Sequence, residues 1–131
     1  MPSQFFPGFR LSTTDILVLV IASVTSVVLG ISQNWLGWLI AFVVCHFFLF
    51  CNVFRISRPL ELLWAGVFLI LAICTARFAI PGWQITLFLS MSLTVILVAI
   101  EMRKPSHHGV WWQYINPELP EWWGRNAGSE Q

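Results

Sequence analysis

WLGWLIAFVVCHFFLFCNVFRISRPLELLWAG, residues 35–66, contains the pattern that decides the fold of this chain. A long apolar run is followed by the short charged connection RISRP and then by the start of a second apolar run. A helix needs about 20 mainly apolar residues to cross the hydrocarbon core of a bilayer. Pro59 suits the first turn of a helix, because the N–H that proline lacks would have no partner there. The stretch therefore predicts two membrane-spanning helices and a polar connection between them.

The same pattern continues on both sides of this stretch. Apolar runs separated by SQN, RISRP and PG predict helices at about 15–32, 35–54, 60–80 and 83–102. Short connections place helices that are neighbours in sequence side by side and antiparallel. We therefore expect an all-α polytopic membrane protein, with four antiparallel transmembrane helices in residues 1–104 and a tryptophan-rich, irregular tail in residues 105–131.

The composition agrees with a membrane protein. A soluble domain carries about 25% charged residues, whereas 10% of these 131 residues are charged and 57% are apolar. So few charges cannot cover a water-facing surface, and lipid is the expected solvent. The formal net charge of +1 and the lack of a basic stripe give no reason to expect nucleic acid as a partner.

The positions of lysine and arginine predict the orientation, because these residues favour the cytoplasmic side of a membrane. Four crossings place Arg77 alone on one side and the other six on the opposite side, namely Arg10, Arg55, Arg58, Arg103, Lys104 and Arg125. We expect both termini in the cytoplasm and the membrane to be a bacterial cytoplasmic (inner) membrane. The first run is long for a signal peptide and only Arg10 precedes it, so we interpret it as a spanning helix.

Two stripes of small or hydroxyl-bearing residues recur every four positions, which places each stripe on one helix face. Such faces pack closely on neighbouring helices in membranes. The hydroxyl stripe has an alternative interpretation as the lining of a polar path. The stripes are Ala22, Ser26 and Gly30 in the first helix, and Thr86, Ser90 and Thr94 in the fourth.

The connection between the second and third helices carries Arg55, Arg58 and Glu61. A carboxylate in the first turn of a helix meets free backbone N–H groups and the positive end of the helix dipole. We expect an ion pair at the cytoplasmic headgroups here. The alternative is a carboxylate that faces a polar path and pairs with an arginine.

His46 lies within the second apolar run, well inside the hydrocarbon layer. An ionisable residue at this depth is a functional hypothesis by default. A neutral imidazole could ligate chlorophyll or haem, or form a hydrogen bond with a quinone. It could also bond only to a neighbouring helix. A bis-histidine haem is not expected, because no second histidine lies at this depth.

Other chemical motifs are weak. The three cysteines lie in apolar runs and in odd number, so a disulfide framework is not expected. The close-spaced Cys and His pairs of zinc sites are absent, and His107 and His108 have no evident third ligand. We expect no metal site, no required cofactor and no enzymatic activity, since no nucleophile and base converge.

The tail concentrates aromatic residues, and Pro117 and Pro120 preclude one long helix. An exposed aromatic cluster would associate with other surfaces in water. We expect it to lie in the headgroups and against a partner, through Trp111, Trp112, Tyr114, Trp122 and Trp123.

These features favour a non-catalytic accessory or scaffold subunit of a larger membrane protein complex, in contact with lipid and with other membrane subunits. One alternative is a cofactor-binding subunit that uses His46. Another is a small oligomeric transporter that uses Glu61, His46 and the hydroxyls of the fourth helix.

Overall fold

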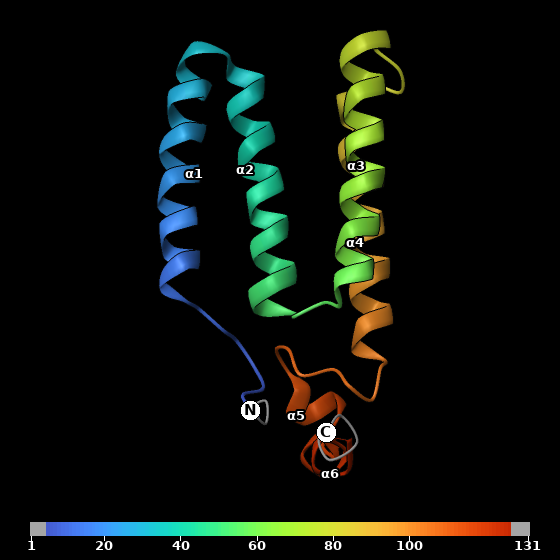
Figure 1. The fold of residues 1–131 in the computed structure, drawn as a ribbon. Coiled ribbons are helices and arrows are strands. Elements are labelled where there is room, and N and C mark those ends of the chain that lie inside the picture. The colour runs from blue at the N-terminus through green and yellow to red at the C-terminus, as the bar shows by residue number, and fades with distance from the viewer. Residues whose placement is uncertain (1–4, 127–131) are drawn as a thin grey trace.

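The computed structural model describes residues 5–126, which contain helices and no strand. Residues 1–4 and 127–131, the ends of the predicted membrane domain and of the predicted tail, lie outside this part. The elements in chain order are α1 (Thr13–Ser32), α2 (Asn34–Phe48), the π-helical turn η1 (Leu49–Val53), α3 (Arg58–Phe78), α4 (Trp83–Met102), α5 (Trp112–Ile115) and α6 (Leu119–Asn126) (Figure 1).

Four helices are long and apolar enough to cross a membrane: α1, α2 together with η1, α3, and α4. The four apolar runs of the sequence are therefore confirmed as helices. The first begins at Thr13, earlier than predicted, because Ser12 caps it. Ser12 Oγ accepts a hydrogen bond from the Asp15 N–H at 3.2 Å, and Asp15 Oδ2 accepts one from the Ser12 N–H at 2.7 Å. The third helix also begins earlier, at Arg58, with Pro59 in its first turn.

The second predicted helix does not keep α-helical geometry to residue 54. Its last turn is π-helical, and the Phe54 N–H donates to the Leu49 carbonyl, five residues back, at 2.9 Å. An α-helical bond reaches four residues back, so this wider turn changes the direction in which the following side chains point. The hydropathy of the sequence does not predict this switch from α-helical to π-helical geometry. The turn includes Asn52, which is buried.

The long helices form two close pairs, α1 with α2 and α3 with α4 (Figure 1). In the first pair the backbones approach at Gly30 and Gly37, where a Cβ on Gly37 would overlap Ser26 and Gly30 backbone atoms. Ser26 Oγ donates to the Gly37 carbonyl at 2.7 Å. In the second pair the hydroxyls of Thr75 and Thr86 lie 2.7 Å apart.

Aromatic side chains join the two pairs. Trp64 of α3 is 1% exposed, and its ring lies against His46 and Phe50 on the α2 side, with centroids 4.7 and 5.5 Å away. Phe68, one turn further along α3, stacks on Trp64 and also contacts Phe42 of α2. Most of the buried core is therefore an aromatic layer between α2 and α3, and Ile56 and Leu97 complete it.

The segment after α4 packs against the end of the helices where α2 joins α3, and backbone hydrogen bonds hold it there (Figure 1). The Val110 N–H donates to the Val53 carbonyl at 2.8 Å, and the Gly8 N–H donates to the His108 carbonyl at 2.6 Å. The tail is not irregular throughout, because it contains α5 and α6. Pro120 is compatible with α6 because it lies in the first turn.

Candidate functional site

His46 has a defined protonation pattern. Its Nδ1 lies 2.8 Å from the carbonyl oxygen of Phe42, one turn back on α2. A carbonyl oxygen only accepts hydrogen bonds, so Nδ1 carries the proton and donates. In the neutral ring Nε2 is then an acceptor, and the side-chain hydrogen bonds among residues 5–126 include His46 only through Nδ1. Such a ring has no N–H left to donate to a quinone carbonyl.

Two aromatic rings fix the position of the imidazole. It stacks on Trp64 at 4.7 Å and 13°, and its centroid lies 4.2 Å from that of Phe42. Trp64 is itself anchored, because its indole N–H donates to Thr94 Oγ1 of α4 at 2.9 Å. The imidazole therefore has one orientation, which is the condition for a specific contact with a ligand.

His46 lines a cleft of about 600 Å³ between α2 and α4. Trp35, Trp38 and Trp83 line the same cleft, and the rings of Trp35 and Trp83 lie 5.5 Å apart. The remaining lining residues are Leu39, Ala41, Phe42, Cys45, Leu87 and Met91, so no charged side chain lines it. This is an apolar, aromatic-walled cleft with one imidazole.

A second, smaller cleft of about 260 Å³ lies between α1 and α2, beside Asp15 and Asn52. In the orientation that satisfies both neighbours, the Asn52 amide nitrogen donates to the Arg10 carbonyl at 2.8 Å and to Asp15 Oδ2 at 3.0 Å. The polar groups beside this cleft thus bind one another.

The predicted cluster at the α2–α3 connection is only partly assembled. Arg58 Nη1 lies 3.2 Å from Glu61 Oε2, and Cys51 Sγ donates to Glu61 Oε1 at 3.5 Å. Arg55 instead donates to the Phe6 carbonyl of the N-terminal segment. Burial and the charge of Arg10 lower the pKa of Arg55.

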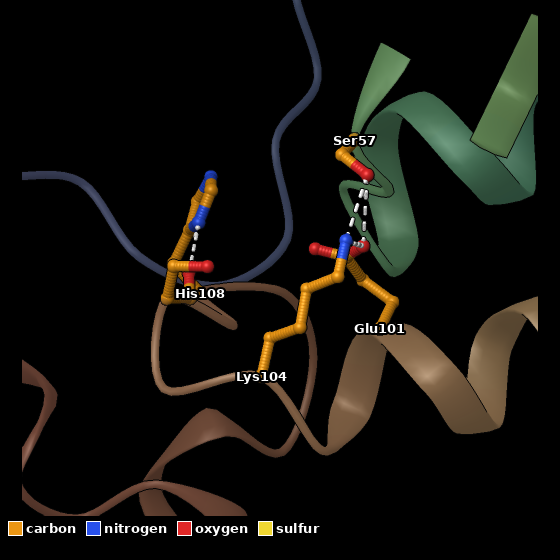
Figure 2. Close-up of polar contacts among 5 residues, drawn as sticks. Ser57, Glu101, Lys104 and His108 are labelled. Atoms are coloured by element: carbon orange, nitrogen blue, oxygen red, sulfur yellow. Dashed lines mark hydrogen bonds and ion pairs between the residues drawn. The ribbon is translucent and has the colours of Figure 1, made fainter. Parts of the chain in front are cut away.

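A second buried carboxylate lies at the same end of the molecule. Glu101 is 4% exposed and accepts from Lys104 Nζ at 2.8 Å and from Ser57 Oγ at 3.1 Å (Figure 2). Lys104 Nζ also donates to Ser57 Oγ at 3.0 Å, which ties the start of α3 to the end of α4. Both buried carboxylates thus have a cation three residues away on the chain.

The hydroxyl stripe of α4 faces α3 and does not line the His46 cleft. Ser90 and Thr94 donate to carbonyls one turn back at 2.8 and 2.9 Å, and Trp64 lies between this stripe and His46. The components of the transporter alternative are therefore not joined into one polar path within residues 5–126. In α1, Ala22 is half-buried like Ser26 and Gly30.

The tail separates its aromatic residues into two groups. Trp112 and Trp123 contact Phe5, with ring centroids 6.0 and 5.5 Å apart, and Trp122 lies beside Trp123. Trp111 and Tyr114 have 59% and 86% of their surface exposed, and the Trp111 ring lies against Phe54 on one side, with ring centroids 6.4 Å apart.

The two tail histidines have different environments. His107 is fully buried, its Nε2 donates to the Val110 carbonyl at 3.2 Å, and its Nδ1 has no partner among residues 5–126. His108 donates from Nδ1 to the Ser106 carbonyl at 2.8 Å (Figure 2). Burial lowers the pKa of His108, and the nearby Arg55 adds to this effect. The described residues contain no group of three side chains suited to a metal ion.

Sequence reasoning missed Trp64, the residue that holds His46 in place. One signal was available, because Trp64 lies about two turns inside the third helix, and a buried tryptophan N–H needs a hydrogen-bond partner. Comparisons with known proteins add no relative: this chain matches no family model, no curated protein and no solved structure.

Proposed function

We propose that this protein is a non-catalytic accessory or scaffold subunit of a larger complex in a bacterial cytoplasmic membrane, with four antiparallel spans and both termini in the cytoplasm. One observation carries the proposal. The tail is fastened to the helices yet leaves Trp111 and Tyr114 exposed, at 59% and 86%.

The fastening of the tail matters because it fixes where these two rings lie. Gly109 packs on the backbone of Phe54, and Val110 donates to the carbonyl of Val53. Trp111 follows directly and has a left-handed backbone conformation (φ 59°). Tryptophan and tyrosine on a pre-ordered surface lose little conformational freedom on binding, and they are common hot spots of protein interfaces.

The charges support the proposed orientation. Residues 5–12, the α2–α3 connection and the tail lie at one end of the helices, whereas Arg77 is in the last turn of α3, at the other end (Figure 1). The end with the tail therefore carries Arg10, Arg55 and Arg58 together with the basic residues after α4. An excess of positive charge marks the cytoplasmic side.

The buried carboxylates also fit a structural role. Glu61 pairs with Arg58, and Glu101 pairs with Lys104, each within the same turn of chain. Glu61, in the first turn of α3, also meets the positive end of the helix dipole, whereas Lys104 offsets the negative end of the α4 dipole beside Glu101. Neither carboxylate needs a reaction to account for its position.

Purification from native membranes in a mild detergent tests the proposal. We expect the tagged chain to co-purify with a membrane protein at fixed stoichiometry. The double variant Trp111→Ala/Tyr114→Ala should recover about tenfold less partner, because loss of a hot spot costs at least 1.4 kcal/mol. Phe88→Ala, which removes an exposed aromatic ring from α4, is the matched control and should keep the partner.

Three results would reject the proposal. One is a wild-type chain that leaves the membrane alone, as a detergent-solubilised monomer. Another is full recovery of the partner by the double variant, which would remove the exposed rings from the interface. If the variant changes only lipid association, the rings are headgroup anchors and the interface proposal also fails.

A further inference from the structure

The unpaired Nε2 of His46 is the starting point. His46 is 7% exposed and lies in a span with no charged neighbour in its cleft. A polar atom that faces hydrocarbon without a hydrogen bond is unfavourable, because no water is present there to supply one. Phe42 already holds Nδ1, so Nε2 can only be satisfied by a donor that enters the cleft.

The cleft has the dimensions and walls of a small-molecule site. Its volume of about 600 Å³ lies inside the range of roughly 300–1,000 Å³ for ligand pockets. Trp35, Trp38 and Trp83 provide aromatic walls. On α2, Trp35 and Trp38 lie eleven and eight residues before His46, so these rings line the part of the cleft away from the imidazole.

The lining limits the charge of the ligand. No cation lines the cleft, so carboxylate groups such as the propionates of haem would have no partner there. An oxidised quinone presents only acceptors, and Nε2 is itself an acceptor. The ligand that fits is neutral and carries a hydroxyl donor on a ring.

We propose that the His46 cleft binds a neutral, lipid-soluble aromatic alcohol of the hydroquinone class, whose hydroxyl donates a hydrogen bond to Nε2 of His46 while its apolar chain extends along the cleft toward Trp35, Trp38 and Trp83. No bond is made or broken in this step. The site is independent of the exposed tail, so it stands or falls separately from the scaffold role.

Three probes that differ at one functional group test the site: a decyl-substituted benzohydroquinone, its dimethyl ether and its oxidised quinone. Binding is measured by quenching of tryptophan fluorescence in lipid nanodiscs, with the signal from empty discs subtracted and reducing conditions for the hydroquinone. We expect the hydroquinone to bind at least tenfold more tightly than the ether or the quinone, because only it supplies the donor.

His46→Phe removes the acceptor and keeps an aromatic ring against Trp64 and Phe42. In this variant the preference for the hydroquinone should disappear. Leu89→Ala, on α4 but outside the cleft lining, is the control and should keep it. In ¹⁵N-labelled wild-type protein, the NMR signal of His46 Nε2 should shift with the hydroquinone and not with the ether.

The three-probe comparison on the wild-type protein decides the matter even if the His46 variant fails to fold. Equal binding of all three probes means that the cleft holds an acyl chain without selectivity, which overturns the proposal. A coloured preparation whose visible band depends on His46 also overturns it, because Nε2 would then ligate the metal of a tetrapyrrole.

Discussion

The indole N–H of Trp64 on α3 donates a hydrogen bond to Oγ1 of Thr94 on α4, over 2.9 Å. The other side of the same ring system stacks on His46 of α2. One side chain thus connects three of the four long helices. This connection matters because contacts between α2 and α3 are otherwise made by side chains that reach across from well-separated backbones.

Removal of this hydrogen bond tests the connection. Trp64→Phe keeps a ring in the core but loses the donor and part of the buried indole, so the free energy of unfolding should fall by more than about 1 kcal/mol. Unfolding by SDS titration from mild-detergent micelles measures the change. Ser92→Ala is the control, since Ser92 bonds only its own helix at the Phe88 carbonyl and is exposed. Equal stability of Trp64→Phe and Ser92→Ala would contradict a role for the hydrogen bond.

The close approach of α1 and α2 gives a second prediction. Gly37→Ala should push the helices apart, because the added Cβ would overlap backbone atoms of Ser26 and Gly30. We expect a loss of about 1–3 kcal/mol in the free energy of unfolding. Gly66→Ala on α3 is the matched control: nothing lies within 4 Å of the added methyl group, and alanine favours a helix over glycine by about 0.5–1 kcal/mol.

The two glycine variants must therefore change stability in opposite directions. The same SDS titration reads both. If Gly37→Ala is as stable as the wild type, the backbones of α1 and α2 are not in contact at Gly30 and Gly37. If Gly66→Ala is destabilising, another molecule or helix lies against that face of α3.

Hydropathy and prolines predicted the four long helices and their approximate ends, because these signals are local. The first helix begins earlier than predicted because Ser12 and Asp15 form a capping box, both bonds of which are present. The π-helical turn at Leu49–Val53 could not be predicted. A π-helical turn and an α-helical turn are compatible with the same apolar run, so hydropathy does not distinguish them. Nor could the environment of His46, which depends on a tryptophan 18 positions later in the chain and on the carbonyl of Phe42.

The tail contacts the helices through Gly109, and a glycine-to-alanine substitution tests this contact as well. A Cβ on Gly109 would overlap the Phe54 backbone, so Gly109→Ala should detach the segment that follows α4. Limited proteolysis should then cleave the tail several times faster than in the wild type. Gly124→Ala, in α6, meets no atom within 4 Å and should leave the cleavage rate unchanged. Equal rates for both variants would show that the tail is held elsewhere.

Tail docking should also weaken in acid because of His108. Burial lowers its pKa below the ordinary value of 6.5, and Arg55 and His107 act in the same direction, whereas Glu101 and the bond to the Ser106 carbonyl oppose them. Between the lowered pKa and 6.5 the undocked tail binds more protons than the docked tail, so docking becomes less stable as the pH falls. Well above pH 6.5 His108 is neutral in both the docked and the undocked tail, so its stabilisation of docking is fully present there. His108→Gln keeps a donor for the Ser106 carbonyl without titrating, so its proteolysis rate should match the wild type at pH 7.5 and rise less on acidification. Identical pH profiles for the two proteins would show that His108 does not cause the acid sensitivity.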